Sequence, residues 1–423
     1  MRAARIAQLA PEWLLTYAGV IMLVSVLVNL ATGFAQTTHS LTIPSMRDSL
    51  HISYTQAGIL VTVAGAVRMG SALAAGTLAP RYGSRAIIGV STMVSGASML
   101  LLGYTPGFSL ALVASALMGL STGAALTPMM GLLAPWFEMR NRGVASGLAA
   151  AGGSVAFIVA GVLVPWFVNQ SPDDGWRHTW RLFGAISLAI GVLSLVLLRD
   201  RPKVNAPAGL LGTSPRAYRG AWPLAVYKNP LVWLVTYLAF CSGVAHGVFS
   251  TFFGAYLSEE NDISLAAAGW LLVMIGVLSV ACGILWGRIS DQLGRGRAFL
   301  VSFLIQGVGF ALFWLIPVMA ALMIASVLLG LTLRAAFTLC AASSGDHVPA
   351  HFAAAAFALM SVGAGLGSTA SPVIAGAIAD TVGIGWSFTL ALGASVMGAA
   401  GAAFLHKIGA TTSPEPVTAR PES

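Results

Sequence analysis

Charged side chains are scarce in this sequence. Only 9% of the 423 residues are Asp, Glu, Lys or Arg, and 57% are hydrophobic, whereas a soluble domain carries about 25% charged residues. So few charges exclude an ordinary water-facing surface. The hydrophobic residues instead form runs of about 20, the length that crosses the hydrocarbon core of a membrane. We therefore expect a multi-pass membrane protein embedded in a lipid bilayer.

The residues needed for several other functions are also missing. The three cysteines fall inside hydrophobic runs, which favours small buried residues over redox or metal chemistry. No phosphate-binding loop, nucleophile–base set or metal-binding cluster is visible, which argues against an enzyme, a cofactor, a bound metal and ATP-driven transport. The net charge of +8 does not indicate a nucleic-acid partner, because the charges lie in short loops between the hydrophobic runs.

Twelve hydrophobic segments predict twelve transmembrane helices, because backbone polar groups in lipid must be paired within each segment. With both termini inside, seventeen of the 22 Lys and Arg residues lie in inner loops and tails, three in outer loops and two inside spans. Positive residues accumulate on the cytoplasmic side, so we expect a protein of the bacterial cytoplasmic (inner) membrane with both termini in the cytoplasm. The segments begin near Trp13, Tyr54, Ala86, Phe108, Gly143, Leu182, Leu231, Ala266, Ala298, Val318, Phe352 and Trp386.

The two halves of the chain resemble each other at a single offset. Ala114–Leu120 aligns with Ala325–Leu331. At the same offset three glycines of each half coincide: Gly76, Gly83 and Gly152 with Gly287, Gly294 and Gly363. A duplication of this kind predicts an all-α membrane protein of two pseudo-symmetric six-helix bundles with a binding site between them.

The expected boundaries follow from the spans and from one long polar segment. We assign residues 1–199 to an N-terminal six-helix bundle and residues 229–407 to a C-terminal one. Residues 200–228, which are basic and rich in Pro and Gly, form the expected cytoplasmic linker. Residues 408–423 form the expected cytoplasmic tail.

Two loops share a motif of glycines and basic residues. The loop after the eighth span, Gly287–Arg297, has a glycine, an acid four residues later, and then a glycine among arginines; Gly76–Arg85 follows the second span. With twelve spans in two halves, these loops resemble those of the major facilitator superfamily. That resemblance implies transport by alternating access and a central cavity lined by spans 1, 4, 7 and 10. A narrower resemblance, to the bacterial YbfB/YjiJ-like branch, rests on Thr251–Leu257 and Ala375–Asp380.

The acid of the motif, Asp291, is the centre of a predicted cytoplasmic latch. A carboxylate there suits a neighbouring helix N-terminus and nearby arginines. Pro80 stands where the first loop should carry the matching acid. The alternative is that these loops only anchor the inner membrane surface. The predicted partners of Asp291 are Arg288, Arg295, Arg81 and Arg142.

Two arginines, Arg334 and Arg68, fall inside predicted spans. Charges inside a membrane are costly and are therefore functional candidates. The resemblance turns Arg334 of span 10 toward the cavity, and Gly123 at the matching place in the other half leaves room for a ligand. Each arginine has an alternative role, which is to snorkel toward the membrane surface; Arg334 could also bond carbonyl groups.

None of the 14 acidic residues lies in the middle of a predicted span. An unpaired buried arginine attracts an anion and binds a carboxylate through two hydrogen bonds. His246 of span 7 and Gln36 of span 1 meet in the repeat and are further candidates for the cavity. His246 is interpreted either as a packing residue or as a proton-coupling group, since histidine titrates near neutral pH.

The sequence therefore predicts a secondary active transporter, expected to be a monomer. Its substrate is expected to be a small organic (carboxylate) or inorganic anion, moved by proton symport or exchange. Proton-driven efflux of an apolar or zwitterionic compound is one alternative, and the missing acid in the spans argues against it. A non-transporting membrane sensor built on a carrier fold is the other alternative.

Overall fold

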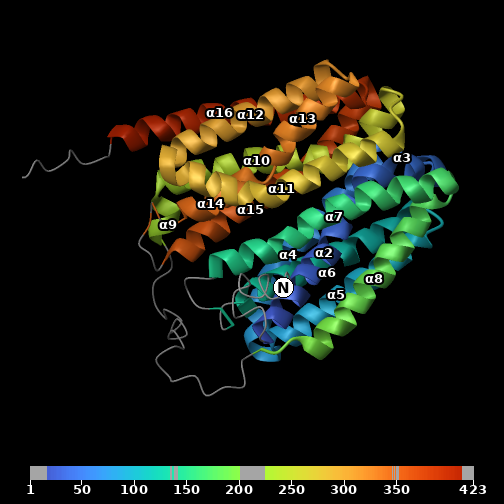
Figure 1. Ribbon diagram of the computed structural model, residues 1–423, viewed down its shortest axis with the longest axis horizontal. Helices are drawn as coiled ribbons and strands as arrows, with labels where there is room; N and C mark the ends of the chain where they lie inside the picture. The colour runs from blue at the N-terminus through green and yellow to red at the C-terminus, as the bar shows by residue number, and fades with distance from the viewer. Residues whose placement is uncertain are drawn as a thin grey trace, which may run out of the picture.

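The computed structural model describes residues 17–133, 136–137, 142–200, 224–344, 346, 348 and 352–411. All regular secondary structure in these ranges is helical (Figure 1). Twelve helices are long and apolar enough to cross a membrane, from the first at Tyr17–Thr37 to the last at Ile384–Ile408. The predicted all-α membrane protein with twelve spans is thus confirmed.

Helices of the first half form the lower group in Figure 1, and helices of the second half form the upper group. The first group consists of α2 (Tyr17–Thr37), α3 (His39–Leu50), α4 (Tyr54–Tyr82), α5 (Ser84–Gly103), α6 (Phe108–Leu133), α7 (Arg142–Gln170) and α8 (Gly175–Leu197). The second consists of α9 (Leu224–Lys228), α10 (Pro230–Ala255), the π-helical turn η2 (Tyr256–Glu260), α11 (Leu265–Leu293), α12 (Arg295–Leu315), α13 (Met319–Thr332), α14 (Ala335–Ser343), α15 (Ala353–Val382) and α16 (Ile384–Thr411).

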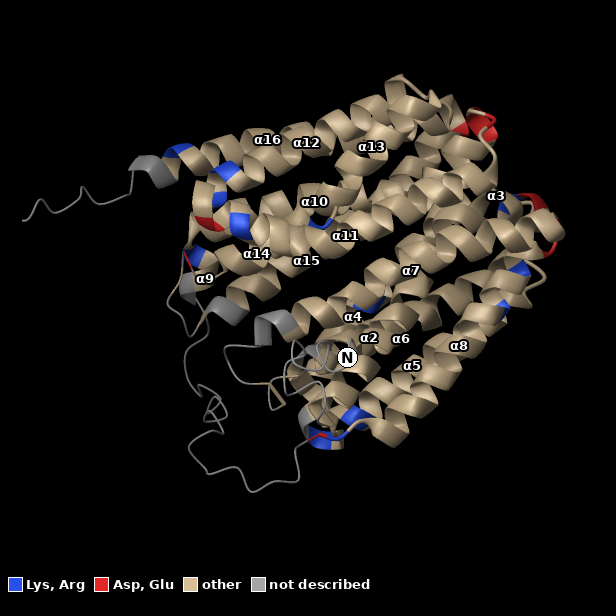
Figure 2. Ribbon diagram, in the orientation of Figure 1, with Lys and Arg blue, Asp and Glu red and all other residues tan. Residues whose placement is uncertain are grey.

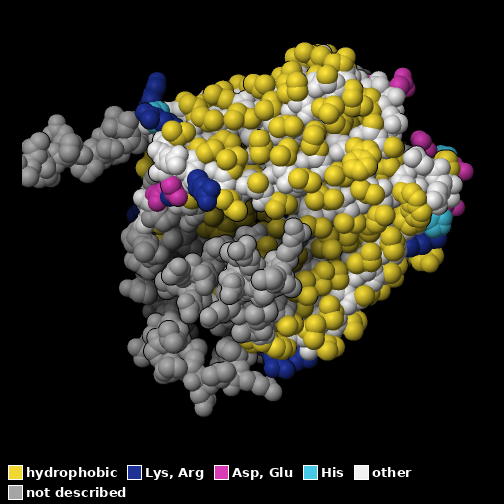
Figure 3. Space-filling view, viewed as in Figure 1, with side chains coloured by type: hydrophobic (Ala, Val, Ile, Leu, Met, Phe, Trp, Pro, Cys, Tyr) yellow, Lys and Arg dark blue, Asp and Glu magenta, His cyan; other side chains and the backbone are white. Residues whose placement is uncertain are grey.

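Charged residues gather at the two ends of these groups, and the middle is nearly free of them (Figure 2). We call the end where α3 and η2 lie the α3 end. The end where α9 lies and where the last described residues of α16 lie is the terminal end. The side of the molecule between the ends is covered mainly by hydrophobic side chains (Figure 3), as a lipid-facing surface requires.

At two of the helix crossings that join the halves, glycine allows a close approach. Where α7 meets α11, a Cβ added to Gly269 would lie 2.1 Å from the carbonyl oxygen of Gly161. Where α4 meets α15, a Cβ added to Gly58 would lie 2.3 Å from the carbonyl oxygen of Pro372. Backbones that approach this closely leave no space for a side chain, which is a common arrangement between membrane helices.

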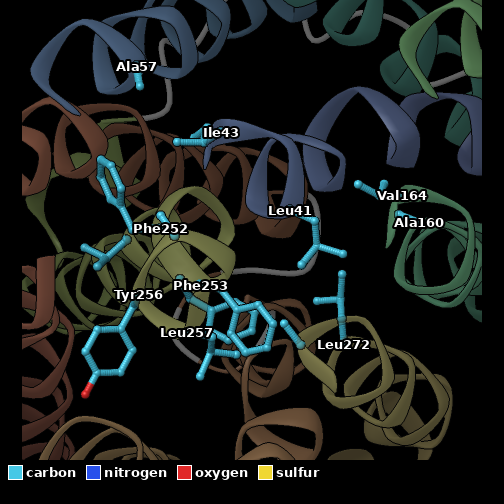
Figure 4. Packing of buried hydrophobic residues seen from close by; sticks show 14 of the residues in the cluster. Leu41, Ile43, Ala57, Ala160, Val164, Phe252, Phe253, Tyr256, Leu257 and Leu272 are labelled. Atoms are coloured by element: carbon cyan, nitrogen blue, oxygen red, sulfur yellow. The ribbon is translucent and has the colours of Figure 1, made fainter. Parts of the chain in front are cut away.

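Among the described residues, the halves share an apolar core that includes the α3 end. One cluster of buried residues combines Leu41 of α3 with Phe252 and Phe253 of α10 and Leu272 of α11 (Figure 4). Two other clusters lie within single halves, one from Val226 to Leu405 and one from Ala18 to Leu198. The halves are therefore packed together at the α3 end.

The helices that cross near the α3 end separate toward the terminal end. A Cβ added to Gly70 of α4, Gly147 of α7 or Gly287 of α11 would meet no atom of the described residues within 4 Å. In Figure 3 the surface is hollowed between the halves on this side, next to the atoms drawn in grey. The described residues of the two halves are therefore packed together at the α3 end and less closely toward the terminal end.

Candidate functional site

A cavity lies between the halves, and the space within it that the centre of a water-sized sphere can reach is about 60 Å³. Its walls come from α2, α3, α4 and α6 of the first half and from α10 and α15 of the second. Three of the four residues expected to bind substrate, Gln36, Arg68 and His246, line this one cavity.

Arg68 is held by a hydrogen bond across the cavity wall. Its Nη1 donates to Oε1 of Gln36 at 2.7 Å, and Nε2 of Gln36 donates to the carbonyl oxygen of Thr32 at 3.2 Å. The two bonds fix the direction of the Gln36 amide. The bond to Gln36 uses one of the five N–H donors of the Arg68 guanidinium. No carboxylate among the described residues forms an ion pair with Arg68.

Arg334 stands at a break in the tenth span, between α13 and α14, with φ −105° and ψ 0°. The carbonyl groups before the break are paired by side chains of α11. Ser279 donates to the carbonyl oxygen of Gly330 at 3.1 Å, and Nε1 of Trp286 donates to that of Leu331 at 2.6 Å. Side chains thus replace the lost helical hydrogen bonds, as lipid surroundings demand.

The Arg334 side chain reaches the other half of the protein. Its Nη2 would lie 3.1 Å from a Cβ added to Gly153 of α7, so the missing side chain of this glycine makes room for the guanidinium. Gly123, which was expected to leave room for a ligand, lies instead in the contact between α6 and α4. A Cβ there would lie 2.2 Å from the carbonyl oxygen of Arg68, because Gly123 packs α6 against α4.

His246 of α10 lies within electrostatic range of both arginines. The positive charges of both Arg334 and Arg68 act on its ring. No ion pair joins either arginine to a carboxylate of the described residues. The cavity therefore combines the guanidinium of Arg68, the imidazole of His246 and the amide of Gln36, and Arg334 is not among its lining residues.

Sequence reasoning missed a second histidine in the same cavity. His39 begins α3, three residues after Gln36, and lines the cavity beside it. On one continuous helix, residues three apart share a face. This spacing was the signal that could have identified His39, although α2 ends at Thr37 and α3 begins at His39. The ring packs on Trp180 of α8, with 4.8 Å between ring centroids.

Among the described side chains of the predicted latch, no ion pair joins the halves in this conformation. Asp291 forms an ion pair with Arg295 of its own half at 2.9 Å, and Arg295 also binds Asp346 at 2.9 Å. Arg81 and Arg288 are exposed. The side chain of Arg142 lies outside the described part of the structure. The latch stays a prediction for another conformation.

Instead, polar contacts join the halves at the α3 end. Arg47 of α3 forms an ion pair with Glu259 of η2 at 2.6 Å and also stacks on the ring of Tyr54 at 3.4 Å. The hydroxyl of Tyr54 donates to Glu259. The carboxylate of Asp380 accepts hydrogen bonds from the backbone N–H groups of Tyr54 and Thr55, both at 2.8 Å. We call these four side chains, Arg47, Tyr54, Glu259 and Asp380, the α3-end clamp.

Comparison with known proteins agrees with this architecture. The model of the Major Facilitator Superfamily matches residues 25–259 and 235–422. A probable sulfoacetate transporter of Cupriavidus necator is 23% identical over 366 residues, which cover 81% of this chain and 83% of the relative. A probable galactarate/D-glucarate transporter of Bacillus subtilis is 24% identical over 287 residues, which cover 62% of each chain.

Among solved structures, a similar fold is that of a bacterial homolog of the human lysosomal transporter Spinster, in an inward-facing and unoccupied conformation. It has a TM-score of 0.75 and 15% identity, and the match covers 96% of this chain and 100% of the other. The narrower resemblance to the YbfB/YjiJ-like branch stays a prediction. The family match covers both halves of the cavity described above, and this chain belongs to the Major Facilitator Superfamily.

Proposed function

We propose that this protein transports a small anion through the cavity between its halves by alternating access. The observation that carries the proposal is the charge of the site: Arg68 and Arg334 lie in the spans, and neither has an ion pair with a described carboxylate. Inserting each arginine costs about 2.5–3.5 kcal/mol on insertion scales. A bound anion offsets part of that cost.

The proposed ligands approach the anion from both halves. Arg68, oriented by Gln36, comes from the first half. Arg334 and His246 come from the second half, and Arg334 reaches as far as α7. Because closing around the ligand requires both halves, binding and conformational change are coupled. The relatives named for sulfoacetate and for galactarate or D-glucarate support an acidic substrate.

The proposed orientation turns the terminal end toward the cytoplasm. The distribution of Lys and Arg supports it through the positive-inside rule. In this orientation the cavity communicates with the cytoplasm and the α3-end clamp closes the outer side. The second half-cycle then requires the clamp to open and the terminal end to close, and Asp291 is proposed to act in that closure.

The test is a substrate panel with purified protein in liposomes. The panel contains sulfoacetate, D-glucarate, inorganic phosphate, a zwitterion and a cation. Uptake of an anion that falls at least tenfold in Arg334→Gln and in Arg68→Gln is expected. Arg297→Gln is the matched control, because Arg297 lies at the start of α12 and binds His406 outside the cavity. Transport of the cation, or an unchanged rate in both arginine variants, would contradict the anion proposal.

A further inference from the structure

His39 is a buried residue whose ring nitrogens lack hydrogen-bond partners among the described residues. The residue is 3% exposed, and neither Nδ1 nor Nε2 has a hydrogen-bond partner among the described residues. Its polar neighbours in sequence are paired: Thr38 donates to the carbonyl oxygen of Phe34, and Ser40 donates to that of Thr37. A buried polar ring without partners is unfavourable and calls for an explanation.

The surroundings of His39 combine an apolar wall with an open polar side. Trp180 packs against the ring, and the Nε1 of Trp180 also has no partner among the described residues. On the cavity side lie Gln36, Arg68 and His246. Of the described residues on the helices packed against α3, Arg68 and His246 are the charged or titratable groups that line this cavity, and neither is an acid.

We propose that His39 binds the transported anion in its protonated form, so that one proton enters the site with each anion. The inference rests on the proposed anion transport. A neutral imidazole offers one N–H donor and one free lone pair, whereas an imidazolium offers two donors. Protonation therefore gives each of the two unpartnered nitrogens an N–H that can donate to an anion. The only reactant is a proton from water.

The neighbouring charges make the coupling obligatory. Without an anion, a proton on His39 adds positive charge to a cavity that already holds Arg68, and that repulsion is strong where water is scarce. A bound anion instead attracts the proton on His39. Each ligand thus raises the affinity for the other, as linkage requires. When the anion leaves, the proton leaves His39 on the same side.

The experiment compares two histidines of one cavity. Liposomes are given a pH difference of one unit at a membrane potential held at zero, with sulfoacetate, D-glucarate or inorganic phosphate as the probe. One coupled proton allows about tenfold accumulation under this gradient. We expect His39→Gln to abolish this accumulation and to keep anion exchange, because glutamine still hydrogen-bonds and does not titrate. His246→Gln should weaken binding and keep the accumulation.

Controls separate this proposal from the proposed function. His178→Gln on α8 should behave as wild type, because His178 contacts Phe167 and does not line the cavity. The number of protons taken up as the anion binds, measured calorimetrically in two buffers, should be about one in wild type. A value of zero overturns the inference even if His39→Gln fails to fold, as does normal accumulation in His39→Gln. If wild type carries none of the anions, the proposed function itself fails.

Discussion

Replacing Asp380 by Asn should loosen the α3 end and shift the protein toward the opposite conformation. Asp380 binds the first two N–H groups of α4 with both carboxylate oxygens, at 2.8 Å each. It therefore caps a helix of the other half and opposes the positive end of that helix dipole. Asparagine keeps one acceptor, loses the charge, and presents an N–H₂ group to the second N–H.

The magnitude follows from the two lost interactions. Loss of a helix N-cap costs about 0.5–2 kcal/mol, and loss of a charge at a helix terminus costs about 0.3–1 kcal/mol. Asp380 is exposed, so screening by solvent favours the lower part of these ranges. A net cost of about 1 kcal/mol lowers the population closed at the α3 end, relative to the open one, by about fivefold.

The assay measures access to the closed interface. Ala57 is 1% exposed at this end of α4, so Ala57→Cys provides a label site in a background without the three native cysteines. Labelling by a membrane-impermeant maleimide should be about fivefold faster when Asp380→Asn is added. Asp48→Asn, an exposed acid of α3, is the control. Equal labelling rates with and without Asp380→Asn, or an equal effect of Asp48→Asn, would refute the reasoning.

Three further predictions concern Arg334, the latch and the crossing of α7 and α11. Arg334→Gln should weaken anion binding about ten- to a hundredfold, because a charge-assisted hydrogen bond contributes about 1.5–3 kcal/mol, and Arg334→Lys should lose less; equilibrium binding to purified variants measures both. Asp291→Asn should slow transport at normal membrane insertion, and wild-type rates would remove Asp291 from the latch. Gly269→Val should separate α11 from Gly161 of α7 and lower the thermal stability, whereas an unchanged melting temperature would show that this crossing adapts.

The sequence was most informative where lipid restricts the choice of residues. A charged side chain in a span is expensive, so Arg68 could be singled out from one chain alone, and the structure places it in the cavity with Gln36 and His246. The spans were equally accessible, because hydrophobic length alone decides whether a helix crosses the membrane. Both inferences use a property of single segments.

The features that were missed depend on pairs of distant segments. Asp380 and Tyr54 meet at the α3 end although more than 300 residues separate them, and no local pattern announces that contact. The break at Arg334 is stabilised by Trp286 of another helix, so the sequence of the tenth span does not reveal it. His39 stood in a polar run beside Thr38, and only the fold shows that its ring has no partner among the described residues.

The arrangement of the apolar clusters has a thermodynamic consequence for the proposed transport cycle. Opening the α3 end must part the cluster that Leu41, Phe252 and Leu272 share across the halves, whereas each of the other two clusters belongs to one half and stays intact. Apolar surface that becomes hydrated raises the heat capacity. The equilibrium between the two conformations therefore has a curved temperature dependence, and its enthalpy and entropy both change across the range in which the cell grows.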